Sequence, residues 1–151
     1  MLNSEKIYIK ESGKFYNVFY DFTKGICLDI TGRINDKVFE KNGSLYIKVK
    51  LDNEVLDSLK YIEYELIKKM GDFNLNIISI FQKNSNSIIL KLPSFRGKLN
   101  DNIKILINDI NVSIYDIDTN DVLNIQILLD TLWNFVDNKL MYKWKLKKIT
   151  S

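Results

Sequence analysis

Histidine and alanine are both absent from this chain of 151 residues, and cysteine occurs once. Without histidine the protein lacks the usual general base of enzymes and the commonest metal ligand. The single Cys27 has no partner for an intramolecular disulfide, as expected in a reducing compartment. Glycine-rich phosphate-binding loops are absent as well. We therefore expect a protein that is not an enzyme and that carries no cofactor.

Long apolar runs are missing too. No stretch reaches the roughly 20 apolar residues that span a bilayer, and the N-terminus MLNSEKIYIK lacks the apolar core of a signal peptide. We therefore expect a cytoplasmic protein with no membrane partner. No linker rich in proline, glycine or serine and no internal repeat divides the chain, so residues 1–151 are expected to form one domain.

The residues that are abundant are isoleucine, asparagine and lysine, a bias typical of an AT-rich genome. Composition is therefore a weak guide to secondary structure and ligand in this chain, and the predictions below depend mainly on the residue pattern. The net charge of +3 is modest but unevenly placed. Residues 139–148 hold five lysines and no acid, whereas residues 109–121 are acidic. Such asymmetry favours an acidic partner, although a solvated strand face would show the same pattern.

Most of the chain alternates polar and apolar residues with period two, which predicts strands. In 44–51 one face holds Leu45, Ile47, Val49 and Leu51, and the other holds Ser44, Tyr46, Lys48 and Lys50. A hairpin is expected at the end of the chain, around the turn residues Asp137 and Asn138. The expected strand segments are 14–22, 25–34, 44–51, 73–81, 87–92, 102–107, 111–117, 122–133 and 139–149.

One segment, 53–70, has helical periodicity instead. Asp52 or Asn53 is suited to cap its start and Gly71 to end it. Its apolar positions, spaced three and four apart, are Leu56, Leu59, Ile62, Leu66 and Met70.

A helix after the third main strand predicts an α+β fold that is mainly β, with an OB-fold-like antiparallel barrel and a C-terminal β-hairpin. A generic α+β domain, in which one helix packs on an antiparallel sheet, fits the pattern almost as well.

Lysines and aromatic residues on the same strand face are typical of proteins that bind single-stranded nucleic acid, since lysines neutralise phosphates and rings stack on bases. Tyr46, Lys48 and Lys50 share such a face. A solvated sheet face with one cross-strand tyrosine is the alternative. The loop SFRGK offers Phe95, Arg96 and Lys98, although Phe95 is equally suited to closing the core.

The ending LMYKWKLKK gives the sharpest prediction. As a strand, it places Tyr142, Trp144 and Leu146 on one face and Lys143, Lys145 and Lys147 on the other. Trp144 is then expected in the core and the three lysines on a functional face. Trp133, at a strand end before the turn, is a further stacking candidate.

A metal site has one candidate, the segment YDIDTND. Strand alternation would put Asp116 and Asp118 on one face, near Asp121, where carboxylates could hold Mg²⁺. A polar turn explains the segment more simply, so no metal is expected.

The last 30 or so residues carry a resemblance. Leu132-Trp133, a polar turn, and Trp144-Lys145-Leu146-Lys147-Lys148-Ile149 resemble the closing segment of virus-type single-stranded DNA-binding proteins with an OB-fold. Such proteins occur in large cytoplasmic DNA viruses and virus-like linear DNA plasmids. The chain departs from that pattern at Asp130-Thr131, where a glycine often stands, and in its basic rather than acidic ending.

The resemblance implies non-sequence-specific binding of single-stranded DNA during replication, without catalysis. The partners expected are single-stranded DNA, possible replication proteins and possible further copies of this chain. The competing hypothesis is a non-catalytic accessory or structural subunit of a viral polymerase or particle, whose aromatic and aliphatic residues would cover a protein interface. A Mg²⁺-dependent enzyme is a third possibility.

Overall fold

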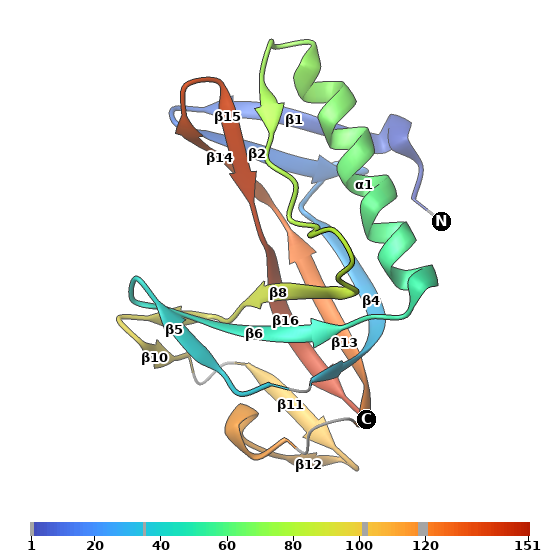
Figure 1. The fold of residues 1–151 in the computed structure, drawn as a ribbon, viewed down its shortest axis with the longest axis vertical. Helices are drawn as coiled ribbons and strands as arrows, with labels where there is room; N and C mark the ends of the chain where they lie inside the picture. The colour runs from blue at the N-terminus through green and yellow to red at the C-terminus, as the bar shows by residue number, and fades with distance from the viewer. Residues whose placement is uncertain (1, 35, 101–102, 118–120) are drawn as a thin grey trace.

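A computed structural model describes residues 2–34, 36–100, 103–117 and 121–151 (Figure 1). The fold is mainly β with one long helix, as predicted. None of the helices in this described part is long and apolar enough to cross a membrane.

Five strands close into a barrel. Around it the order is β4–β6–β8–β16–β13 and back to β4, and every pairing is antiparallel except β8 with β16. In chain order β4, β6 and β8 are neighbours, and the fourth strand, β13, returns to pair with β4. This arrangement is a Greek key, as in an OB-like barrel. The strands are β4 (Ile26–Ile34), β6 (Ser44–Lys50), β8 (Ser87–Lys91), β13 (Val122–Leu129) and β16 (Trp144–Thr150).

A second sheet adjoins the barrel and shares its C-terminal hairpin. The strand β13 continues past Asp130 as β14, and β15 continues past Lys143 as β16, so one long hairpin runs through both sheets (Figure 1). The order is β1–β2–β14–β15–β7, with β3 on the free part of the β2 edge. The strands are β1 (Ile7–Ser12), β2 (Phe15–Tyr20), β3 (Thr23–Lys24), β7 (Asn76–Ile77), β14 (Thr131–Val136) and β15 (Lys139–Tyr142).

Shorter elements decorate the barrel. The strand β5 forms a hairpin with β6, β9 pairs with β10, and β11 lies parallel to β16 with β12 on its outer edge. Their bounds are β5 (Phe39–Lys41), β9 (Ser94–Phe95), β10 (Lys98–Leu99), β11 (Lys104–Ile107) and β12 (Ile110–Asn111), with 3-10 helices η1 (Ser4–Lys6) and η2 (Ile114–Asp116).

The helix α1 (Asn53–Gly71) has the predicted apolar side, and all five of its predicted core positions are buried. Asp52 occupies the N-cap position, but its side chain makes no capping hydrogen bond. The helix follows β6, the strand predicted at 44–51, as expected, although β1, which was not predicted, makes β6 the fourth strand of six or more residues. It is nevertheless inserted between the second and third strands of the barrel, because β2 belongs to the other sheet.

Two expected strands are wrong over most of their length. Within 73–81 only Asn76–Ile77 is a strand, because the N–H groups of Phe73 and Asn74 bond back to the last turn of α1 and that of Ile80 bonds to the side chain of Glu63. Within 111–117 the chain forms η2, whose first turn is capped when the Ser113 hydroxyl accepts a hydrogen bond from the Tyr115 N–H.

The C-terminal parity prediction is confirmed. Tyr142, Trp144 and Leu146 are buried, while the lysines between and after them are partly or fully exposed. Trp144 is fully buried in the core, and its indole N–H has no hydrogen-bond partner among the described residues. Burial of its apolar surface therefore outweighs the penalty of that unpaired donor.

Barrel closure requires a small residue where β4 turns onto β6. At Gly32 a Cβ atom would lie 2.6 Å from Cγ1 of Val49 and 3.2 Å from the carbonyl oxygen of Lys50. Such contacts are closer than side chains tolerate, so glycine lets the two backbones approach and complete the ring of strands.

Candidate nucleic-acid interface

The outer surface of the barrel strands β6, β8 and β16 carries a row of cations, which we call the barrel face. Hydrogen-bond register places Lys91 opposite Tyr46 on one side and opposite Lys145 on the other. Lys48 follows on β6, opposite the exposed Ile89 of β8. Three neighbouring strands thus present lysines toward one side.

Beside this face lies a groove of about 650 Å³ between the barrel and the second sheet. Phe15 of β2 and Trp133 of β14 are register partners in it, and Phe15 is 53% exposed. We call it the lysine–aromatic groove. Its full lining is Ser12, Phe15, Asn17, Lys24, Lys91, Thr131, Trp133, Lys143 and Lys145.

Lys143 is held in place by an aromatic ring. Its ammonium nitrogen lies 4.0 Å from the centroid of the Tyr46 ring, within the range of a cation–π contact. Burial raises the pKa of the Tyr46 phenol, but the hydrogen bond and charge of Lys143, together with Ser44 and Lys91, outweigh burial and hold that pKa below its ordinary value. Lys143, at the junction of the two sheets, thus contacts Tyr46 and also lines the lysine–aromatic groove.

Tyr46 itself is not an exposed stacking platform, contrary to its predicted role. The residue is only 8% exposed, because its ring stacks on Phe39 of β5 at 5.7 Å between centroids and is covered by Lys143. The hairpin of β5 and β6 and the junction of β15 and β16 both meet over this position. Phe39, at 39% exposed, is the ring that reaches the surface there.

Lys145 carries an internal counter-ion. Its ammonium lies 2.8 Å from the carboxylate of Asp130, at the break between β13 and β14. Burial raises the pKa of Asp130, but the hydrogen bond and charge of Lys145, helped by Thr131 and Lys24, outweigh burial and lower that pKa. The carboxylate is therefore ionised at neutral pH and neutralises part of the charge of the groove.

Two smaller grooves extend this surface. One, of about 430 Å³, contains Lys91 and Lys145 and reaches Lys147. The other, of about 440 Å³, contains Lys143 and reaches Lys48 and Phe39. Because each shares lysines with the lysine–aromatic groove, the three form one continuous track, which we call the lysine track.

Five of the predicted binding residues line the lysine track. They are Lys48, Trp133, Lys143, Lys145 and Lys147. Lys50 is exposed at the far end of β6 and lines a separate cavity with Arg33 and Asp52.

Of the predicted loop 94–98, Ser94 lines the track near Lys147. Arg96 and Lys98 are not among the lining residues of the three grooves, and the Gly97 N–H donates to the carbonyl of Gly43. The side chain of Phe95 lies outside the described part of the structure.

Sequence reasoning missed Phe15, Lys24, Phe39 and Lys91 as members of the track. The segment of Phe15 is aromatic on both of its strand faces, so alternation alone leaves the exposed face undecided. Lys91 sits in an ordinary strand pattern and becomes notable only when β8 lies between β6 and β16.

The geometric argument for the candidate metal site in YDIDTND does not hold in the structure. Asp116 is exposed in η2 rather than in a strand, so the alternation that would align it with Asp118 does not apply. Asp118 lies outside the described residues. Among the residues that are described, no group of three or more carboxylate, thiol or imidazole side chains is placed to hold a metal ion.

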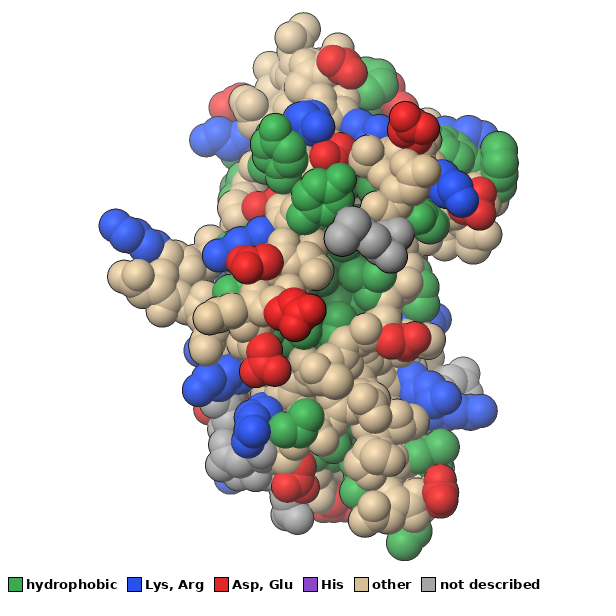
Figure 2. All heavy atoms as spheres, turned by 90° about the vertical axis from the view of Figure 1, so that its right-hand side faces the viewer, with side chains coloured by type: hydrophobic (Ala, Val, Ile, Leu, Met, Phe, Trp, Pro, Cys, Tyr) green, Lys and Arg blue, Asp and Glu red, His purple; other side chains and the backbone are tan. Residues whose placement is uncertain are grey.

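A different cavity lies on the face covered by α1. It has a volume of about 690 Å³ between α1 and β4, and its lining includes Leu28, Val55 and Tyr61. Asp29, Glu54 and Asp57 are its charged lining residues, with no lysine or arginine among them. Figure 2 shows acidic side chains around a hollow with apolar side chains at its floor. This cavity, called the α1 groove below, is electrostatically unsuited to a phosphate chain.

Comparison of the chain with protein-family models, with curated proteins and with solved structures finds no match. The resemblance of the C-terminal hairpin therefore stays a prediction, and the case for a function rests on the geometry of the lysine track.

Proposed function

We propose that this protein binds single-stranded DNA without sequence preference, in the replication of a virus or virus-like element. The observation that carries the proposal is the lysine–aromatic groove, where Phe15 and Trp133 face each other across strands among four lysines. Phosphates would contact the lysines while unpaired bases stack on the rings. Base stacking on an aromatic side chain contributes about 1–3 kcal/mol and tolerates every base.

The residue types in the track support single-strand binding over duplex binding. Phe15 and Trp133 offer ring surface in a recess between two sheets, and a base can stack on such a ring only when it is not already stacked within a duplex. The cations are all lysines, which bind phosphate as point charges and offer no rigid fork for reading base edges. Recognition of this kind is expected to depend on backbone charge and stacking.

The experiment that tests the proposal is a titration of fluorescent dT oligomer, about 30 nucleotides long, followed by anisotropy at low and moderate salt with duplex DNA as competitor. If about four phosphates are neutralised, log K should fall against log salt with a slope near −3. Affinity that does not change with salt, or that duplex DNA abolishes at equal concentration, would contradict the proposal. Titration with an RNA oligomer of the same length shows whether the protein prefers DNA or RNA.

Replacing Asp130 with asparagine is expected to tighten binding of the same oligomer several-fold. The carboxylate neutralises Lys145 at 2.8 Å, so its removal leaves the lysine free for a phosphate. The measurement is the dissociation constant at fixed salt beside that of the wild type. Asp29→Asn, which removes an exposed acid of the neighbouring strand β4, is the control for net charge. An equal gain from both variants would show that Asp130 has no special place in the site.

The α1 groove favours a second candidate function, an accessory or structural subunit that contacts another protein. Apolar floor and acidic margin together suit a protein surface better than a nucleic acid. A stable stoichiometric complex with a replication protein, together with no affinity for the dT oligomer, would favour this function over DNA binding.

A further inference from the structure

The turn between β2 and β3 has an unusual residue at its tip. Tyr20 pairs with Thr23, so Asp21 and Phe22 form a two-residue loop, and both have positive φ, 49° and 69°. This is the backbone of a type I′ turn, whose second position is normally glycine because side chains disfavour that conformation. Phe22 is nevertheless found there, and its side chain is 88% exposed.

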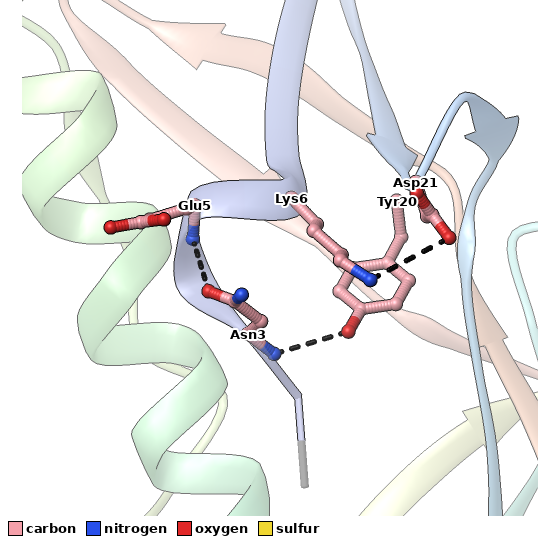
Figure 3. Close-up of polar contacts among 5 residues, drawn as sticks. All are labelled: Asn3, Glu5, Lys6, Tyr20 and Asp21. Atoms are coloured by element: carbon pink, nitrogen blue, oxygen red, sulfur yellow. Dashed lines mark hydrogen bonds and ion pairs between the residues drawn. The ribbon is translucent and has the colours of Figure 1, made fainter.

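The turn is held firmly in place from outside. The Asp21 N–H donates to the carbonyl of Lys6 at 3.0 Å, and the Lys6 ammonium lies 3.8 Å from the Asp21 carboxylate. Next to it, the Asn3 N–H donates to the Tyr20 hydroxyl, while Asn3 also caps η1 (Figure 3). An exposed phenylalanine in strained backbone gains little from folding, so its position on an anchored turn points to a contact with another molecule.

Phe22 is the tip of an aromatic cluster that we call the β2 aromatic cluster. The rings of Tyr8 and Phe19 stack at 5.0 Å and 5°, and the Phe22 ring lies 6.3 Å from that of Tyr8. The Lys10 ammonium sits 5.5 Å from the centroid of the Phe19 ring. The cluster thus combines flat apolar rings with a cation, as the lysine–aromatic groove does.

The cluster is also continuous with that groove. Phe19 is on the same face of β2 as Phe15 and Asn17, which line the groove. Its cross-strand partner on β3 is Lys24, another groove residue. A polymer that leaves the groove at Lys24 therefore meets the β2 aromatic cluster next.

We infer that the bound single strand continues from the groove across the outer face of β1, β2 and β3, where Phe22 stacks on a base. This inference rests on the proposed function and extends it to a second subsite for the same nucleic acid. The protein then contacts more nucleotides than the barrel alone would, and a single OB-fold usually contacts about 4–16 nucleotides. Binding should accordingly strengthen with oligomer length beyond the length that fills the groove.

The test compares dT oligomers of about 6 and about 20 nucleotides, the first within and the second beyond the usual site size of one OB-fold, with wild type, Phe22→Ala and Phe22→Gly. Both variants should bind the longer oligomer about tenfold more weakly, the size of one lost stacking contact, and the shorter one unchanged. Phe22→Gly is chosen because glycine suits the positive φ at this position. Its thermal midpoint should therefore be no lower than that of the wild type.

A matched control is Tyr115→Ala. Tyr115 is 62% exposed in η2 and lines none of the three grooves of the track, so its loss should change neither affinity. Unchanged affinity of Phe22→Gly for the longer oligomer would overturn the second subsite while leaving single-strand binding intact. The second subsite would also be overturned if the Phe22 variants bound both oligomers equally more weakly. The same holds if they changed the oligomeric state of the protein without changing its affinity. Failure of the wild type to bind either oligomer would overturn both proposals.

Discussion

Replacing Lys91 and Lys143 together with alanine is expected to weaken binding of the dT oligomer by about 100-fold at moderate salt. The two lysines lie where the three grooves of the lysine track meet, so both should contact phosphate. Lys143 is oriented by the ring of Tyr46 at 4.0 Å, which makes its loss the larger of the two. Anisotropy titrations at several salt concentrations measure the effect.

The salt dependence gives a second readout of the same variant. Each lost phosphate contact removes about 0.7 from the slope of log K against log salt, so the slope should become shallower by about 1.4. The control is Lys60→Ala with Lys69→Ala, an exposed and a half-buried lysine of α1 that change the net charge equally but line none of the grooves. If the control variant weakens binding as much, then DNA binding depends on the net charge of the protein and not on the lysines of the track.

Replacing Glu63 with alanine is expected to destabilise the protein by about 3 kcal/mol or more. Its buried carboxylate accepts hydrogen bonds from the Tyr142 hydroxyl at 2.8 Å, the Ser79 hydroxyl at 2.7 Å and the Ile80 N–H at 3.1 Å. These bonds tie α1 to β15 and to the segment before β8. Removal of the acceptor leaves the buried Tyr142 hydroxyl unpaired, and burial with the nearby carboxylate already raises the pKa of that phenol, so it stays a donor.

A neighbouring glutamate supplies the control for this experiment. Glu65 on α1 is also buried, but the ion pair that its carboxylate makes within the described part of the chain is with Lys68, whose side chain is 52% exposed, at 3.1 Å. Glu65→Ala should therefore have a much smaller effect on the free energy of unfolding, measured by denaturant titration of each variant. Equal losses from the two variants would mean that burial of a helix side chain, and not the hydrogen-bond network, sets the stability.

The binding assay on Glu63→Ala links the network to the site. Tyr142 immediately precedes Lys143, so the bond from Tyr142 to Glu63 fixes the backbone from which that lysine extends. Provided that the variant is folded at the assay temperature, it should bind the dT oligomer more weakly than Glu65→Ala does.

The helix and the C-terminal parity are properties that local pattern determines. Apolar residues three and four apart bury one side of α1 whatever lies against it, although the helix includes Gly71 and reaches its C-cap at Asp72, one residue beyond the predicted end. Alternation in β16 likewise places Trp144 and Leu146 inside and Lys145 outside. Both outcomes depend only on backbone geometry and on the apolar character of nearby residues, so the sequence is sufficient to predict them.

The binding site depends on contacts between distant segments. Alternation correctly puts Tyr46 on the face opposite Leu45 and Ile47, yet the ring is covered, because β5 and the β15–β16 junction fold over it. Phe15 and Trp133 are far apart in the sequence and meet only because β2 pairs with β14. The alternation of polar and apolar residues along one strand predicts which side chains share a face. The pairing between strands determines what covers that face. For this reason Trp133 and the lysines of β6 and of the C-terminal strand could be predicted from the sequence, whereas Phe15, Phe39, Lys24 and Lys91 required the tertiary structure.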